Sequence, residues 1–467
     1  MKQTRTLSEE LADFAVRASY DGISREAVRQ LKARILDSLG CAIGAMEGGP
    51  VRIILEHVRD FGGAGVSTLI GGGKTSPDRA AFYNSALVRY LDFNDSYLSK
   101  GETCHPSDNL GAILSASEYA NKSGRDFLTA LAVSYQVQCA LSDAAPVRAK
   151  GFDHTTQGSF ALASGISKAL GLDQEKTANA VSICGTAFNA LRVTRTGALS
   201  NWKGLAYPNA AFCCVHATFL AMRGITGPRE VFEGNKGFME AISGRFEIDW
   251  SKEDLERVRR TVIKKYNAEV HSQSAIEAAL ELREERGISV PDVERVEIDI
   301  FDVAYNIIGG GEEGDRAIVR TKEEADHSLQ YMIAVALLDG KVMPDEYLPE
   351  RIRAADVQSL LKKVIVRPNE AMSRAFPEEH SCRVTIFLKG GVGISRSKKD
   401  YEGFHTRPMD REGVARKFMA LAGPFLEAGL ADDIVEAVDN LEKKSMRDFT
   451  GLLSRAGVKK DGRKENI

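Results

Sequence analysis

The sequence has no CxxC pair, and its seven cysteines are scattered along 467 residues. A structural zinc site or an iron–sulfur cluster of ordinary spacing is therefore not expected, because both use closely spaced cysteines. Cys213 and Cys214 lie in the apolar stretch AAFCCVHATFLAM and are interpreted as core residues. Reduced, scattered thiols are typical of the cytosol.

An excess of charge of one sign and long apolar runs are also lacking. The formal net charge is -3, and a nucleic-acid partner is not expected, because such proteins usually carry a basic face. We find no uninterrupted apolar run of the ~20 residues that a bilayer requires. The opening residues, MKQTRTLSEELADFAV, have no apolar stretch typical of a secretory signal. We therefore expect a cytoplasmic protein with no membrane partner.

Familiar catalytic motifs are missing as well. The segment IGGGKTSPDRAAF lacks the first glycine of the GxxxxGK[ST] loop and the apolar strand that should precede it. Neither GxSxG nor HExxH occurs. The sequence therefore indicates no phosphate-binding loop, no nucleophile elbow and no zinc-binding helix of this type.

Helical periodicity dominates the chain up to about residue 265 and returns after about residue 408. In the segment that opens at Ser24, the residues Val28, Leu31 and Ile35 recur at the spacing of one helix face. Several later segments carry glycine, alanine and serine on their apolar faces. Such faces allow close packing and predict buried helices.

Between these helical regions the period changes. In VERVEIDIF (293–301), Val296 and Ile298 alternate with acidic residues, which is the pattern of a half-buried strand. Residues 362–370 and 383–397 read as a further strand and a hairpin. A mixed α+β segment therefore interrupts the helical pattern.

These patterns predict a mainly α fold, with a large all-helical domain interrupted by a smaller α+β domain. A chain of 467 residues is long enough for two domains. The helical domain is expected to cover residues 1–266 and 408–467, and the α+β domain residues 267–407.

The stretch LDFNDSYLSKGETCHPSDNL (91–110) places many polar groups between two helical segments. Part of this polarity has a structural explanation, since Ser107 or Asp108 can cap the helix that follows. Such a cap does not account for Asp92 or His105. The stretch is either a surface loop or one wall of a site that faces a polar ligand.

Other histidines and cations also lie at the ends of predicted elements. They are His154 in GFDHTTQGS, Arg192, Arg195 and Lys203 in LRVTRTGALSNWKG, Lys264 and His271 in IKKYNAEVHSQS, and His327 and Tyr331 in ADHSLQY. Taken singly, each is more often a loop histidine or a solvated cation than a catalyst. Three further histidines, His57, His380 and His405, are expected at the surface.

Together these motifs resemble the MmgE/PrpD family, which includes 2-methylcitrate dehydratase, cis-aconitate decarboxylase and iminodisuccinate epimerase. The resemblance rests on LDFND followed by HPSD, then GFDHTT, SNWKG, KKYNAEVHSQSAIEAA and DHSLQYMIAVALLDG, and it runs through nearly the whole chain in order. YNAEVHSQSAIEA and DHSLQY are more similar to the methylcitrate dehydratase branch than to the decarboxylase branch. Two features depart from the family pattern: Asn267 stands where members often have proline, and the spacing between LDFND and HPSD varies.

The resemblance implies a helical domain interrupted by an α+β domain, an active site in the cleft between them, and a homodimer that needs no metal and no organic cofactor. It also implies which residues form the site. The expected catalytic residues are Asp92, His105, His154, Lys203, Lys264 and His271. The expected substrate-binding residues are Ser96, Tyr331, Arg192 and Arg195, the two arginines being added on their charge alone.

These residue types suit chemistry on a polycarboxylate. A substrate with three or four negative charges needs several cations to hold it, which arginine and lysine supply. Dehydration of a β-hydroxy acid needs a base for the proton alpha to a carboxylate and an acid for the departing hydroxyl. A histidine tuned by a carboxylate such as Asp92 can act as either. Decarboxylation and epimerisation use the same kind of intermediate, so the site does not choose among them.

We therefore expect a cofactor-independent hydro-lyase of propionate metabolism that dehydrates 2-methylcitrate or a related hydroxy-polycarboxylate. The alternatives within enzymes are a cis-aconitate-type decarboxylase and an epimerase or isomerase of a dicarboxylate. The alternative of another class is a non-catalytic protein that binds organic acids. These residues leave open the stereochemistry of the substrate and which histidine is the acid and which the base.

Overall fold

The computed structural model describes residues 5–457. Helices hold 59% of the structure and strands 9%, so the predicted mainly α fold with a smaller α+β part is confirmed. The chain forms two compact units. The first, here called the helical unit, contains residues up to 192, residues 204–261 and residues from 410 onward; the second, the mixed unit, contains residues 193–203 and 262–409. The predicted division had assigned residues 193–203 to the helical domain.

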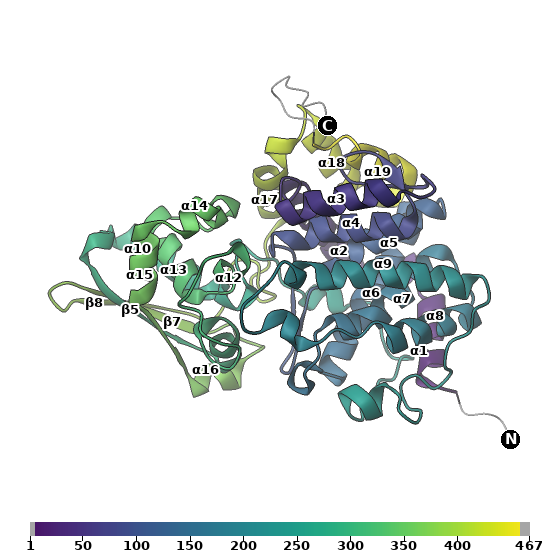
Figure 1. Cartoon of the computed structure of the whole chain (residues 1–467), viewed down its shortest axis with the longest axis horizontal. Coiled ribbons are helices and arrows are strands. Elements are labelled where there is room, and N and C mark those ends of the chain that lie inside the picture. The colour runs from purple at the N-terminus through teal and green to yellow at the C-terminus, as the bar shows by residue number, and fades with distance from the viewer. Residues whose placement is uncertain (1–4, 458–467) are drawn as a thin grey trace. The chain divides into compact units, whose positions relative to one another are not determined.

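The helical unit is built from long helices that run side by side (Figure 1). They are α1 (Leu7–Arg17), α2 (Arg25–Gly44), α3 (Gly49–Phe61), α4 (Pro77–Tyr90), α5 (Leu110–Tyr119), α6 (Gly124–Ala144), α7 (Thr155–Leu170), α8 (Gln174–Ala187), α9 (Trp202–Met222), α17 (Arg411–Ala422), α18 (Leu430–Asp439) and α19 (Met446–Leu453). Two two-stranded ladders accompany them: β1 (Ser67–Thr68) with β2 (Lys74–Thr75), and β3 (Tyr97–Leu98) with β4 (Thr103–Cys104).

The core of this unit depends on the small residues that the sequence places on helix faces. α6 and α7 pack against each other, and nearly every residue of both is buried. A Cβ atom on Gly165 of α7 would lie 1.9 Å from the Oγ of Ser134 on α6. No side chain fits at that distance, so glycine permits the close approach of these two helices.

The helix α2 has the N-cap that its sequence predicts, but α5 does not. Ser24 accepts a hydrogen bond from the backbone N–H of Ala27 and caps α2. The N-cap of α5 is Asn109, and no side chain caps that helix. The predicted caps lie one turn earlier, in the short 3-10 helix Pro106–Asn109. The expectation that Ser107 or Asp108 caps α5 is therefore wrong.

Among the described residues, α9 has the length and apolarity that a bilayer span needs, with a mean hydropathy of 1.3 over its most apolar window. This helix is not an uninterrupted apolar run, because Lys203, Asn209 and His216 lie within it. Of that window, 56% is buried inside the protein, and helices in the core of a globular protein meet the same criteria. Cys214 on α9 is fully buried, whereas Cys213 is only half-buried.

The mixed unit contains a four-stranded sheet with the order β6-β5-β7-β8. Its strands are β5 (Val293–Ile300), β6 (Val364–Pro368), β7 (Cys382–Leu388) and β8 (Gly393–Lys398). β5 pairs in parallel with β6 and antiparallel with β7, and β7 and β8 form the predicted hairpin. Val296, Ile298 and Ile300 are fully buried, as their alternation predicts.

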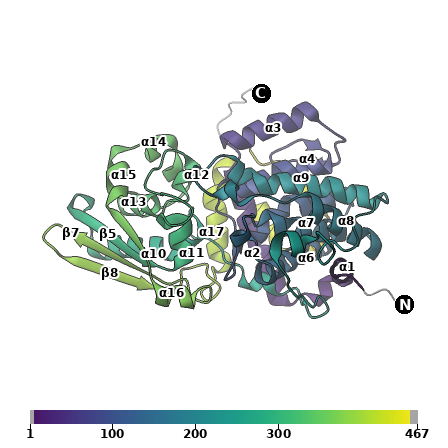
Figure 2. The same ribbon diagram turned by 60° about the horizontal axis from the view of Figure 1, so that its bottom comes forward.

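Helices cover the buried face of this sheet. α10 contacts β7 and β8 (Figure 2), and α13 contacts α10 and β6. The helices of the unit are α10 (Gln273–Arg286), α11 (Asp302–Ala304), α12 (Lys322–Ala325), α13 (Leu329–Asp339), α14 (Pro349–Ile352), α15 (Ala355–Leu360) and α16 (Glu370–Ala375). The segments that precede α10 and α13 carry the predicted residues Lys264, His271 and His327.

Candidate functional site

In the helical unit, the β3–β4 hairpin brings two predicted site residues together. Tyr97 pairs with Cys104, so Ser96 and His105 lie opposite each other where the short ladder ends. The Oγ of Ser96 lies 3.0 Å from the Nδ1 of His105. Both side chains are buried. A hairpin with strands of only two residues has no alternation that the sequence could reveal.

The main chain orients the ring of His105. Its Nδ1 lies 2.9 Å from the backbone carbonyl oxygen of Asp95. Because a carbonyl oxygen only accepts, this contact assigns the proton of the neutral ring to Nδ1. The Nε2 of His105 then keeps its lone pair, as a general base requires.

Asp92 lies two residues after the end of α4 and is held by a buried arginine. Arg89 donates from Nη1 to the Oδ1 of Asp92, and its Nε lies 3.7 Å from the Oδ2 of Asp108. All three side chains are at most 3% exposed. Such a buried charge cluster requires mutual pairing, because an isolated buried charge is costly.

His154 lies beside His105 at the start of α7. The two ring centroids are 5.3 Å apart, in an edge-to-face arrangement. The Nδ1 of His154 lies 3.4 Å from Asp153 and its Nε2 lies 3.8 Å from Asp108. The structure therefore brings together two predicted histidines and places one of them between two buried carboxylates. Arg192, the predicted binding residue of this unit, reaches Asp153 at 3.8 Å.

Asp95 is the second acid of the LDFND motif and is fully buried. Burial raises its pKa to about 6, although its carboxylate accepts hydrogen bonds from the backbone N–H of Ser107 at 3.0 Å and from the hydroxyl of Tyr135 at 2.8 Å. A carboxyl group of this kind changes its charge within the physiological pH range.

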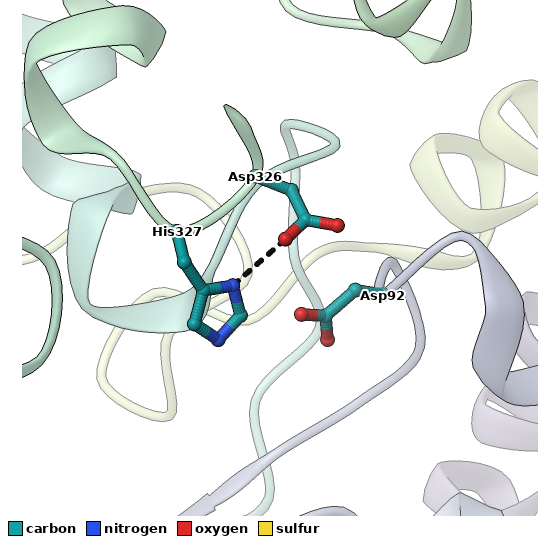
Figure 3. A group of neighbouring side chains, drawn as sticks. All are labelled: Asp92, Asp326 and His327. Atoms are coloured by element: carbon teal, nitrogen blue, oxygen red, sulfur yellow. Dashed lines mark hydrogen bonds and ion pairs between the residues drawn. The ribbon is translucent and has the colours of Figure 1, made fainter. Parts of the chain in front are cut away.

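In the mixed unit, Lys203 meets Asp326 and His327. The Nζ of Lys203 lies 2.7 Å from the Oδ1 of Asp326 and 2.9 Å from the Nδ1 of His327. Figure 3 shows Asp326 and His327. The Oδ1 of Asp326 and the Nδ1 of His327 are 2.8 Å apart. Lys322 binds the other oxygen of Asp326 at 2.7 Å. Burial opposes the charge of Asp326, but these two lysines and His327 hold its pKa well below the usual range.

A second carboxylate–imidazole pair lies just before α10. The Nδ1 of His271 is 2.7 Å from the Oε1 of Glu269, and both side chains are buried. Burial disfavours the charge of Glu269, but His271, His327 and Lys264 hold its pKa at about 2. An ionised Glu269 accepts a hydrogen bond from the Nδ1–H of His271 and orients the ring. Lys264 is itself fully buried.

The other predicted residues of this unit are also buried. Arg195, only 5% exposed, ends the short 3-10 helix Arg192–Arg195. The hydroxyl of Tyr331, on α13, donates to the backbone carbonyl of Glu346, and burial raises its pKa. The expectation that His380 lies at the surface is wrong. That ring is buried beside Phe301 and Tyr401, and burial lowers its pKa to about 3.

Sequence reasoning missed the partners of the predicted residues. Arg89, Asp108, Glu269 and Asp326 complete the clusters, yet none was named as a site residue. The sequence does hold a signal for Arg89, which interrupts the apolar end of α4 three residues before Asp92. The other three precede or follow a predicted histidine within three residues.

Two family models match this chain. The MmgE/PrpD N-terminal domain matches residues 9–251, and the MmgE/PrpD C-terminal domain matches residues 266–443. Among curated proteins, the alkylcitrate dehydratase phiI of Fungal sp. (strain ATCC 74256) is 29% identical, over 94% of this chain and 92% of its own. The 2-methylcitrate dehydratase of Escherichia coli (strain K12) is 27% identical, over 85% and 86%. The cis-aconitate decarboxylase of Mus musculus is 26% identical, over 94% and 91%. The match to both models and to these relatives along most of its length means that the chain belongs to the MmgE/PrpD family.

Proposed function

We propose that this chain is a lyase that dehydrates 2-methylcitrate or a closely related hydroxy-polycarboxylate, without a metal or an organic cofactor. The observation that carries this proposal is the pair of imidazoles formed by His105 and His154, 5.3 Å apart and accompanied by buried carboxylates. Acid–base dehydration needs two groups that exchange protons near neutral pH, which histidines provide.

In the proposed reaction, one imidazole removes the proton alpha to a substrate carboxylate, and a second group protonates the departing hydroxyl. The electron pair of the broken C–H bond forms the double bond as water leaves. The tautomer of His105 supports its assignment as the base, because its Nδ1–H donates to the backbone carbonyl of Asp95 and the lone pair stays on Nε2. His154 is then the candidate acid.

The cations of the mixed unit support a polyanionic substrate. Lys203 and Lys264 are buried lysines, and both lie among carboxylate–imidazole pairs. A lysine that binds a substrate carboxylate forms a charge-assisted hydrogen bond, and one beside the carbanion-like centre stabilises the developing charge. We assign both residues to the binding of substrate carboxylates.

The choice of dehydration over decarboxylation rests on sequence likeness. Two of the relatives described above are named dehydratases of alkylated citrates, and one is named a cis-aconitate decarboxylase. The segments YNAEVHSQSAIEA and DHSLQY resemble the dehydratase branch. Decarboxylation of cis-aconitate is therefore the second candidate, because it uses the same intermediate.

A substrate panel tests this proposal. The purified protein is treated with a chelator and incubated separately with 2-methylcitrate, citrate, longer 2-alkylcitrates and cis-aconitate, and the products are identified by mass spectrometry. We expect loss of one water from 2-methylcitrate or an alkylcitrate. Loss of carbon dioxide from cis-aconitate would instead identify a decarboxylase. Thermal stabilisation by these acids with no product would identify a binding protein.

A further inference from the structure

Asp92 adopts a backbone conformation that residues other than glycine rarely adopt. Its φ is 54°, in the left-handed region, and its backbone N–H donates to the carbonyl of Arg89 at 3.0 Å. For a residue other than glycine, this conformation costs free energy and persists only where the surroundings impose it. Contacts beyond the local turn must therefore hold Asp92 in place.

One such contact comes from a distant part of the helical unit. Lys417 on α17 donates from Nζ to the carbonyl oxygen of Phe93 at 2.8 Å, and the same Nζ lies 3.7 Å from the centre of the Phe93 ring. It also lies 2.6 Å from the Oδ1 of Asp37 on α2. Lys417 therefore binds the residue directly after Asp92 through both its main chain and its ring.

The energetic cost of this arrangement argues that it does more than join two helices. The side chains of Lys417 and Asp37 are 5% and 0% exposed. A buried ion pair contributes little net stability compared with apolar side chains of similar size, because both charges lose their hydration. An apolar contact between α2 and α17 would serve the fold as well. An apolar side chain could not bind the carbonyl of Phe93.

We infer that Lys417, held by Asp37, is a positioning residue that keeps Asp92 in its left-handed conformation and so directs the Asp92 carboxylate. This inference rests on the proposed function, in which Asp92 is a catalytic residue as the family resemblance implies. Arg89 holds the carboxylate of Asp92 itself, and Lys417 holds the backbone one residue later. The two cations fix the loop from both sides.

The chain offers a matched control. Lys32 on α2 donates to the backbone carbonyl of Asp439 at 2.7 Å and pairs with Glu442. Like Lys417, it joins α2 to the C-terminal part of the helical unit, but its hydrogen bonds and ion pair involve no residue of the 92–96 loop. Lys32→Met therefore removes a lysine bridge of the same kind without releasing Phe93.

The experiment compares Lys417→Met, Asp37→Asn, the double variant and Lys32→Met in melting temperature, kcat and KM. Because small misplacement of a reacting group is costly, we expect Lys417→Met to lower kcat about tenfold to a hundredfold. The double variant should recover part of the lost melting temperature, since no unpaired Asp37 carboxylate remains, while its kcat stays low. Lys32→Met should lower the melting temperature and leave kcat unchanged. A folded Lys417→Met protein with wild-type kcat, or recovery of kcat together with stability in the double variant, would overturn the inference.

A readout that needs no substrate separates this inference from the proposed function. Amide hydrogen exchange of residues 92–96 should accelerate in Lys417→Met and in the double variant, and not in Lys32→Met. If the wild-type protein turns over no panel substrate, the proposed function fails, but this exchange pattern still supports the positioning role. Unchanged exchange at residues 92–96 in a folded Lys417→Met protein would refute that role. If Lys417→Met does not fold, the double variant is compared with Lys32→Met in its place.

Discussion

The backbone carbonyl of Asp95 accepts a hydrogen bond from the Nδ1–H of His105 at 2.9 Å, while the carboxylate of Asp95 accepts one from the backbone N–H of Ser107 at 3.0 Å. A single residue therefore orients the ring of His105 with its main chain and anchors the segment after His105 with its side chain. The ring position depends on hydrogen bonds from both sides of the hairpin.

This orientation makes His105→Gln an informative change. Glutamine keeps a polar side chain but cannot act as a base near neutral pH, so we expect kcat to fall by about two to four powers of ten. The melting temperature should change little. Asp92→Asn should act in the same direction, and the double variant should lose less than the product of the two effects. Steady-state kinetics and thermal unfolding of the three variants provide the measurement. Near-wild-type kcat in a folded His105→Gln protein would shift the role to His154 or His271.

The two buried lysines of the mixed unit should act mainly on substrate binding. We expect Lys203→Ala and Lys264→Ala each to raise KM about tenfold to a hundredfold, because a charge-assisted hydrogen bond contributes roughly 1.5–3 kcal/mol. Lys322→Ala is the control, since Lys322 binds the same Asp326 carboxylate as Lys203. It should lower stability and leave KM unchanged. Unaltered kinetics in both lysine variants would show that Lys203 and Lys264 do not bind substrate.

The pKa of Asp95 predicts how stability depends on pH. The folded protein holds this pKa at about 6, above the ordinary value of 3.8, so the folded state binds the proton more tightly than the unfolded state. The stabilisation from this group is complete below pH 4 and is lost as the pH rises through about 6. Asp95→Asn removes this dependence. The free energy of unfolding of the variant minus that of the wild type should therefore increase from pH 4 to pH 8, by at most about 3 kcal/mol.

Urea unfolding of both proteins at several pH values measures this difference directly. Other titrating groups contribute equally to the two proteins and cancel. A difference that does not change between pH 4 and pH 8 would show that Asp95 titrates outside this range.

Chelation should leave turnover intact. The sequence contains no CxxC pair, and the proposed chemistry assigns the proton transfers to His105 and His154, with no step on a metal. We expect dialysis against EDTA to change kcat by less than the error of the assay. Loss of activity that added iron or another divalent metal restores would contradict the cofactor-independent mechanism.

The elements with a strong period were predictable from the sequence. The alternation of Val296, Ile298 and Ile300 identified β5, and its segment lies at the centre of the sheet. The missing cap of α5 was not predictable, because tertiary contacts use its candidates. Asn94 donates to both Ser107 and Asp108, at 2.8 and 2.9 Å. A polar residue before a helix reads as a cap whether or not another side chain binds it.

The candidate site shows the same division. The motifs identified the chemical types of the site residues. They did not identify the side chains that contact these residues, because those contacts form only when the chain folds. Asp108 lies 46 residues before His154 in the sequence, yet their side chains lie 3.8 Å apart. The burial of His380 was also not predicted. A histidine in a polar sequence context was expected at the surface, but the aromatic residues around it come from separate segments.

The return of the chain to the helical unit after residue 410 has a consequence for synthesis on the ribosome. α2 emerges early, but α17, which covers it and carries Lys417, is translated only after the whole mixed unit. At ~5–20 residues per second, this delay lasts roughly twenty to seventy seconds. During that time the nascent chain exposes the apolar face of α2 together with the Asp37 carboxylate, so a chaperone that shields this face would assist folding.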